Sequence, residues 1–177
     1  EKRDNNYSVG DIIMGNVKKV VSGLNATFID VGYQRDGFLH YLDLGPQIKS
    51  YKKYAQKCIE NKIKTSSLKN FKLEPDINKE GKISEIIKQN EKLLVQITKE
   101  PISTKGPRLT TEISLAGRYM VLLPFSNRVS VSQKISSISE KKRLKKLITS
   151  IKPEGFGVII RTVAENQKVA ELDKDLK

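Results

Sequence analysis

The sequence is poor in the residues that build metal centres and disulfides, with one cysteine, Cys58, and one histidine, His40, among 177 residues. A single cysteine can form no internal disulfide and no multi-cysteine zinc site, and this usage is typical of a reducing cytoplasm. His40 has no cysteine or histidine partner at ligand spacing, so we interpret it as a surface or stacking residue. We therefore expect a cytoplasmic protein that binds no metal and no cofactor with this chain.

The chain also lacks a run of about 18 apolar residues that could span a bilayer, and it opens without the apolar stretch of a signal peptide. The motifs G-x-x-x-x-G-K-[ST], G-x-G-x-x-G, H-E-x-x-H and G-x-S-x-G are absent as well. No carboxylate cluster suits two-metal cleavage of a phosphodiester, and we expect Asp173 and Asp175 to face solvent from a charged terminal helix. These residues predict a protein that binds, with no catalytic residue of its own.

Positive charge dominates instead, because Lys and Arg total 33 against 20 Asp and Glu, a net charge of +13. Such a charge attracts phosphate polyanions over long range, so nucleic acid is the expected partner and an anionic membrane surface is the rival. The length of 177 residues is enough for one domain of ordinary size or two small ones. Its 37% hydrophobic and 30% charged residues make the chain polar but do not predict disorder throughout. It begins at Glu1 without methionine and ends on a charged segment, so we expect it to be part of a longer protein.

Two aromatic residues stand out in ATFIDVGYQRDGFLHY, residues 26–41. The two halves of this stretch alternate with a period of two around a turn of glycines and polar residues, which predicts a β-hairpin. Ile29 and Val31 share the face expected in the core, whereas Phe28 shares the other face with an aspartate. Phe38 has the corresponding position on the second strand, so the hairpin is expected to present both rings on a solvated face. Packing of the rings under another element is the alternative.

The strand pattern predicts an α+β fold that begins with a five-stranded OB-type β-barrel. Five runs have strand character, with a longer connection between the third and the fourth: 11–21, 26–32, 36–41, 92–99 and 108–114. Such barrels bind single-stranded nucleic acid through aromatic platforms and a basic groove, on the face where Phe28 and Phe38 fall. Gly15 in the first strand indicates a close backbone approach or a bend.

The longer connection holds a lysine-rich helical insertion. From Lys49 to Lys72 there are eight lysines and one acid. Apolar residues spaced four apart predict an amphipathic helix with a basic outer face: Tyr51, Ala55, Ile59 and Ile63. We interpret the lysines as a solvated helix face, with a contribution to nucleic-acid binding as the alternative.

Residues 117–177 are predicted to form a small α/β unit with the order strand, strand, helix, strand, helix. Ser139 is the expected N-cap of the first helix, which Pro153 ends. Its buried positions follow helical spacing: Leu144, Leu147, Ile148 and Ile151. The last strand leads into Arg161 and Thr162, whose planar guanidinium and hydroxyl suit a phosphate, although most such pairs are simply surface residues.

Several stretches resemble, in the same order, the amino-terminal region of the bacterial ribonuclease E/G family. The most specific are LTTEISLAGRYMVLLP (109–124) and GVIIRT (157–162), supported by ATFIDVG with RDGFLH and by VQITKEP with STKGPRLTT. The similarity runs from about Tyr7 to the end, with a family-variable insertion at 43–80. SVSQKI (130–135) is closer to the shorter ribonuclease G type.

The resemblance implies an RNA-binding domain of the ribosomal protein S-one type, an OB fold, at 7–116. It implies that a subdomain at 117–177 senses the 5′-monophosphate of RNA. In the family, both are inserted in a ribonuclease-H-like catalytic domain. By position, Phe28, Phe38 and Lys105 match the family's RNA-contacting residues in the OB domain.

Four further positions match the family's 5′-phosphate pocket. Arg161 and Thr162 match the pair that binds the phosphate, and Gly117 and Val121 match residues beside the terminal nucleotide. Gln133 departs from the pattern, since some members carry an arginine there that supports the pocket. The resemblance therefore leaves the strength of phosphate sensing open.

The resemblance also says what to expect of the parent enzyme. The family's catalytic aspartates and zinc-link cysteines match positions beyond Lys177, so the chain resembles the substrate-recognition half of a magnesium-dependent endoribonuclease. Such a hydrolase acts in RNA processing and decay, and it is expected to be a homo-oligomer.

Three hypotheses follow for the function. The first is the RNA-binding and 5′-sensing portion of a ribonuclease that acts on single-stranded RNA. The second is a free-standing RNA-binding or ribosome-associated module without nuclease activity, and the third is a basic domain whose aromatic residues meet a protein. A reading frame that continues past Lys177 with catalytic carboxylates favours the first, a stop codon there favours the second, and a lack of salt-dependent RNA affinity favours the third.

Overall fold

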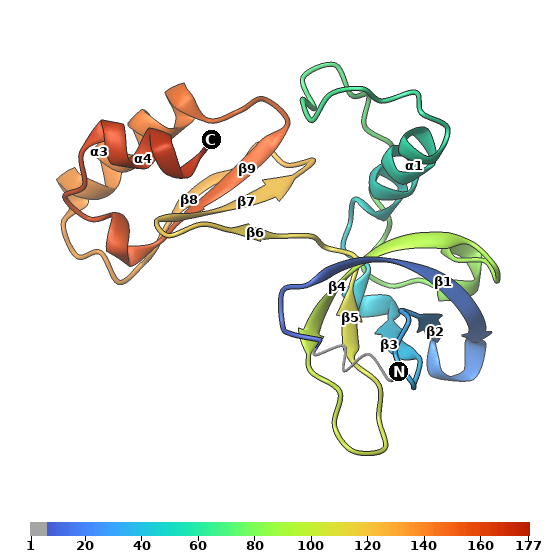
Figure 1. Cartoon of the computed structure of the whole chain (residues 1–177). Helices are drawn as coiled ribbons and strands as arrows, with labels where there is room; N and C mark the ends of the chain where they lie inside the picture. The colour runs from blue at the N-terminus through green and yellow to red at the C-terminus, as the bar shows by residue number, and fades with distance from the viewer. Residues whose placement is uncertain (1–6) are drawn as a thin grey trace, which may run out of the picture. The chain divides into compact units, whose positions relative to one another are not determined.

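The structure is a computed structural model that describes residues 7–177 (Figure 1). It divides into two units, each with its own hydrophobic core. The first unit takes the chain up to Lys64 together with Glu74–Ile113, and the second takes Thr65–Leu73 together with Ser114–Lys177. Along the described residues, no helix is both long enough and apolar enough to cross a membrane.

The first unit is a closed five-stranded barrel. Its strands are β1 (Ile12–Val21), β2 (Ala26–Asp30), β3 (Gly37–His40), β4 (Lys92–Lys99) and β5 (Arg108–Thr110). They pair in the order β1-β2-β3-β5-β4, and every neighbouring pair is antiparallel except β3 and β5. The short 3-10 helix η1 (Ser22–Leu24) joins β1 to β2. All five strands predicted from the sequence are therefore confirmed.

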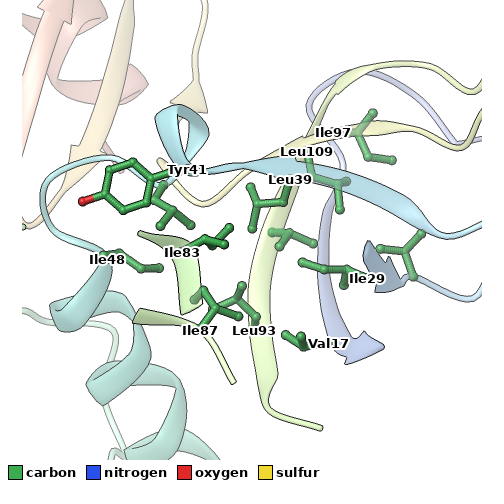
Figure 2. Close-up of a cluster of buried hydrophobic side chains, with 13 residues drawn as sticks. Val17, Ile29, Leu39, Tyr41, Ile48, Ile83, Ile87, Leu93, Ile97 and Leu109 are labelled. Carbon is green, nitrogen blue, oxygen red and sulfur yellow. The ribbon is translucent and has the colours of Figure 1, made fainter. Parts of the chain in front are cut away.

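The barrel interior is filled by branched aliphatic side chains from alternate strand positions. Ile29, Leu39 and Leu109 are fully buried there with side chains from the other strands (Figure 2). A Cβ at Gly15 would overlap the side chain of Ile29 and crowd the carbonyl oxygen of Asp30. The close approach predicted at this glycine is confirmed, because β1 and β2 lie too near each other there for a larger residue.

Between β3 and β4 the chain forms η2 (Tyr41–Asp43), α1 (Ile48–Ile59) and α2 (Ile83–Ile86). Tyr51 and Ala55 of α1 are buried, as the spacing predicts, but Ile59 is 46% exposed. The predicted stripe is wrong beyond Ala55, because the helix stops at Ile59 and the chain turns at Asn61, which has a left-handed φ of 55°. The short helix α2 was not predicted, and it contributes the fully buried Ile83 to the barrel core.

The second unit is a four-stranded sheet with helices. Its strands are β6 (Leu115–Ala116), β7 (Met120–Pro124), β8 (Val129–Val131) and β9 (Phe156–Ile160). They pair in the order β6-β7-β9-β8, with β8 parallel to β9. The helices are α3 (Ile138–Ile151) and α4 (Val169–Asp175), and η3 (Thr162–Ala164) follows β9. The predicted α+β architecture, an OB-type barrel followed by a small α/β unit, is confirmed.

The start of α3 differs by two residues from the prediction. Ser137 is the N-cap, because its hydroxyl accepts a hydrogen bond from the Glu140 amide at 3.2 Å, so the assignment of the cap to Ser139 is wrong. Of the predicted buried face, Leu144 and Ile148 are fully buried, whereas Leu147 and Ile151 are only half-buried against the same core. The helix ends before Pro153.

Residues 65–73, from the long connection between β3 and β4, pack in the second unit. Leu68 is buried, and a Cβ at Gly155 would collide with its side chain. The rings of Phe71 and Phe125 lie with their centroids 5.1 Å apart. The second unit therefore combines two stretches of chain separated by forty residues of the barrel.

Candidate nucleic-acid interface

Phe28 and Phe38 face each other across β2 and β3. They are directly paired in the strand register, their ring centroids lie 5.6 Å apart and their planes meet at 66°. Both side chains are half-buried, while Ile29 and Leu39, the next residue on each strand, are fully buried. The alternation of the strands thus brings the two aromatic rings together on the outer face of the barrel.

Arg108 lies over one of these rings, and sequence reasoning missed it as a site residue. It is the first residue of β5, it pairs with Phe38 in the parallel register, and its guanidinium carbon is 5.3 Å from the centre of the Phe38 ring. Nε and Nη2 of Arg108 each lie 2.9 Å from Oδ2 of Asp43, which also accepts a hydrogen bond from the His40 amide. The carboxylate holds the guanidinium in place beside the ring.

Lys105 lies on an exposed loop that two contacts hold against the barrel. Ile102 and Lys105 exchange backbone hydrogen bonds of 2.7 and 3.1 Å, and Arg35 donates to the Thr104 carbonyl oxygen at 2.6 Å. A Cβ at Gly106 would overlap the carbonyl oxygen of Asp36, so only glycine lets the two loops approach this closely.

The loop and the aromatic face share a hollow of about 380 Å³. Phe38, Lys105 and Arg108 line it. The three residues predicted for the first site therefore meet in the structure, since Phe28 stacks edge-on against Phe38. The arrangement offers an aromatic platform with two cations around it, one fixed and one on an exposed loop.

The second cluster of predicted residues lies where β9 ends. Arg161 is exposed, and its Nη1 donates to the Gly117 carbonyl oxygen at 2.9 Å. The hydroxyl of Thr162 is 2.8 Å from that of Ser132, the residue that follows β8. Because β8 and β9 are parallel, both strands deliver these side chains to the same edge of the sheet.

Val121 and Gly117 flank this edge on the β6–β7 hairpin. Val121 is half-buried on β7, between Ala116 of β6 and Ile159 of β9 in the strand register. Gly117 lies in the hairpin turn, which its amide closes by donating to the Met120 carbonyl oxygen at 2.8 Å. Gln133 is exposed in the loop after β8.

Two residues beside Gly117 were not singled out from the sequence as parts of this cluster. Arg118 is exposed, and its guanidinium carbon lies 5.2 Å from the centre of the Tyr119 ring. Asp175, expected to face solvent, instead accepts hydrogen bonds from the backbone amides of Arg118 and Tyr119 at 2.9 Å and of Met120 at 3.1 Å. No local pattern could reveal these bonds, because they join residues more than fifty positions apart.

The net positive charge is concentrated in the second unit. Its sequence holds 15 Lys and Arg against six Asp and Glu, whereas the first unit holds 18 against 14. One acid is firmly paired: hydrogen bonds from Arg143 lower the pKa of Glu140 to about 2, with further help from the Asn166 amide and against the effect of burial. Between residues 7 and 177, no group of three His, Cys, Asp or Glu side chains is placed to hold a metal ion.

The fold is an OB-type barrel with a second, α/β unit, and the chain that forms it is basic. Residues 114–177 match the model of the "Ribonuclease E/G family". The chain is 37% identical to ribonuclease E of Nostoc over 172 residues, and 39% identical to ribonuclease G of Escherichia coli strain K12 over 167 residues. It is 40% identical over 159 residues to a ribonuclease E/G-like protein of Porphyra purpurea. Over nearly its whole length, the chain is therefore similar to proteins of the ribonuclease E/G family.

The matches cover nearly all of this chain but a minor part of each relative. They take in 97, 94 and 89% of the chain, in the order given, but only 21, 30 and 26% of the three relatives. The chain thus spans about a fifth to a third of the length of the curated relatives it matches.

Proposed function

We propose that this chain is the RNA-recognition part of an endoribonuclease of the E/G type, binding single-stranded RNA and its 5′-monophosphate end. One observation carries the proposal: the sequence similarity to ribonucleases E and G includes both the cluster around Phe38 and the cluster around Arg161. The match spans both units, and each unit exposes aromatic or cationic groups suited to RNA.

In the first unit, Phe28 and Phe38 would stack with unpaired bases, while Lys105 and Arg108 would neutralise neighbouring phosphates. Stacking of a base on an aromatic ring contributes about 1–3 kcal/mol and tolerates any base. The ion pair with Asp43 keeps Arg108 beside Phe38, so this cation is already in place before RNA arrives.

In the second unit, Arg161 and Thr162 would bind the terminal phosphate, and Gly117 and Val121 would lie beside the first nucleotide. A terminal monophosphate carries more charge than an internal phosphodiester and exposes more oxygens. A guanidinium that makes one hydrogen bond to Gly117 keeps further donors for those oxygens. The exposed Gln133 adds no charge, so the preference for a 5′-monophosphate should be modest.

The proposal extends to the parent enzyme, a cytoplasmic, homo-oligomeric and magnesium-dependent hydrolase of RNA processing and decay. The described residues offer no carboxylate cluster for magnesium, so no step of the cleavage is assigned to this chain. The domain limits proposed are 7–116 for the RNA-binding domain with its insertion at 43–80, and 117–177 for the 5′-sensor, with residues 65–73 of the insertion packed in the second unit. A free-standing binding module is less well supported, since the relatives named above are ribonucleases or ribonuclease-like.

A competition titration tests the proposal with one pair of oligonucleotides. Two single-stranded RNAs of the same sequence, one with a 5′-monophosphate and one with a 5′-hydroxyl, are titrated against the wild type and Arg161→Ala. The variant should bind the monophosphate RNA about 1.5–3 kcal/mol more weakly and the hydroxyl RNA almost unchanged. Affinity for either RNA should fall with salt by about 0.7 log units per log unit of salt for each phosphate neutralised.

Arg128→Ala is the matched control, because it removes the same charge from an exposed position of the same unit. It should not change the preference between the two RNAs. Equal weakening of both RNAs by Arg161→Ala would reduce Arg161 to general basic surface, and a lack of salt-dependent binding would defeat the proposal as a whole.

A further inference from the structure

Asp175, the last residue of α4, closes the backbone of the β6–β7 turn. Its Oδ1 accepts from the Arg118 amide at 2.9 Å, and its Oδ2 accepts from the amides of Tyr119 and Met120 at 2.9 and 3.1 Å. A Cβ at Gly117 would lie 2.6 Å from Oδ2, so any larger residue at 117 would force the carboxylate to shift. Three amide hydrogen bonds to a carboxylate make a strong, charge-assisted contact.

Two carbonyl oxygens of the same turn accept hydrogen bonds from Arg161. The Gly117 carbonyl oxygen accepts from Nη1 of Arg161 at 2.9 Å, and the Tyr119 carbonyl oxygen accepts from the Arg161 amide at 2.8 Å. Asp175 therefore fixes the peptide groups whose oxygens orient both the backbone and the guanidinium of Arg161. The hydrogen bonds of the Asp175 carboxylate go to the amides of the turn and not to Arg161, so its influence on Arg161 passes through the turn.

We propose that Asp175 is a positioning residue for Arg161, which sets how well this edge of the sheet discriminates a 5′-monophosphate from a 5′-hydroxyl. The inference rests on the proposed function of Arg161. If electrostatics alone acted, removing the negative charge of Asp175 near a phosphate site would strengthen phosphate binding. The positioning role predicts the opposite, a weaker preference for the phosphate.

The test compares Asp175→Asn with Asp173→Asn in the whole chain. Both variants remove one negative charge from α4, but Asp173 makes an ion pair with Lys177 at 2.6 Å and does not bond to the turn. The measurement is the ratio of affinities for the two RNAs of the previous titration at fixed salt. Asp175→Asn should lower that ratio by about fivefold or more, on the scale of one charge-assisted hydrogen bond, and Asp173→Asn should leave it unchanged.

Asp175→Glu separates position from charge, since it keeps the carboxylate but moves it by one methylene group. Positioning predicts that this variant also loses the preference. In the Arg161→Ala background, Asp175→Asn should have no further effect on the ratio, because the residue acts through Arg161. Amide hydrogen exchange at Arg118, Tyr119 and Met120 should speed up in both Asp175 variants and stay slow in Asp173→Asn, which checks the contact without RNA.

The outcomes separate this inference from the proposed function. If Arg161→Ala keeps the preference, the proposed function fails. If Arg161→Ala abolishes the preference while both Asp175 variants retain it, the positioning role alone is wrong. An increased preference in Asp175→Asn would also overturn it, and would identify the carboxylate as an electrostatic competitor of the phosphate.

Discussion

Phe38 differs from its neighbour Phe28 in one feature, the guanidinium of Arg108. It is half-buried, it packs edge-on against Phe28, and the guanidinium of Arg108 lies over its ring. Truncating Phe38 would therefore remove a stacking surface and also release a cation from its place. Truncating Phe28 would remove only the ring beside it.

We predict that Phe38→Ala weakens binding of single-stranded RNA by about 1–3 kcal/mol, and Phe28→Ala by an amount at the lower end of that range. Binding is measured by titration, and stability by thermal unfolding of the same samples. Leu24→Ala is the control, because Leu24 is a large apolar residue that is 55% exposed and lies in η1. A loss of about 3–5 kcal/mol in stability with unchanged affinity would show that the rings serve the core instead.

At the scale of single elements, α3 depends on the contacts around its first turn. Ser137 caps the helix, and the carboxylate of Glu140 accepts hydrogen bonds from two nitrogens of Arg143 and from the amide of Asn166. Glu140 is only 9% exposed. These bonds join the start of the helix to the segment that follows η3, so they fix the element beside the strand end that carries Arg161 and Thr162.

The pKa of Glu140, lowered to about 2, predicts how stability depends on pH. Since the folded value lies below the unfolded value of about 4.3, the stabilisation is fully present above that pH and is lost as the pH falls toward 2. Glu140→Gln should cost about 2 kcal/mol of unfolding free energy at pH 7, the usual scale for hydrogen bonds to a charged group, and the difference from the wild type should vanish near pH 2. Urea unfolding at pH 7, 4 and 2.5 measures this.

Glu154→Gln is the matched control for that series. Glu154 is 65% exposed at its side chain and lies 3.8 Å from Lys69, so its loss should change stability little at any pH. A difference between Glu140→Gln and the wild type that persisted undiminished at pH 2.5 would mean that packing, and not the charge, is what the substitution disturbs.

The elements themselves were largely predictable, because their signals are local. Alternation around Ile29 and Leu39 reveals the strands, and the spacing of Leu144 and Ile148 reveals α3. The ends of the elements were harder to predict from the sequence. Ile59 fits the helical spacing of α1 but lies where the helix stops.

The partners of the candidate site were not predictable. Phe28 and Phe38 could be paired from one hairpin, since their separation along the chain is short. Arg108 reaches Phe38, and Asp175 reaches the turn after Gly117, only through the closure of the barrel and the docking of α4. Contacts between residues more than fifty positions apart leave no periodic trace in a single sequence.

For the molecule as a whole, the second unit cannot be described by one continuous range. Leu68 is buried in it and Phe71 packs against Phe125, although both come from the connection between β3 and β4. A fragment of residues 114–177 would lack these side chains, and the ring of Phe125, which is 3% exposed, would lose a packing partner.

We predict that Leu68→Ala lowers the stability of the second unit by about 2–4 kcal/mol, as expected for a buried leucine. Leu73→Ala, at a position of the same segment that is 51% exposed, should cost much less. Amide exchange in β7 and β9 of the whole chain reports on this unit separately from the barrel. Equal protection in the two variants would mean that residues 65–73 lie on the unit without supporting it.

The order of pairing in the barrel also sets a sequence of events during synthesis. β1, β2 and β3 can pair as soon as residues 12–40 are available, but their two outer edges must wait for β4 and β5. Until the ribosome has added residues 92–110, the nascent chain can hold at most a three-stranded sheet with both edges open. Open edges invite pairing with other chains, and the lysines that follow β3 add repulsion between nascent copies during that interval.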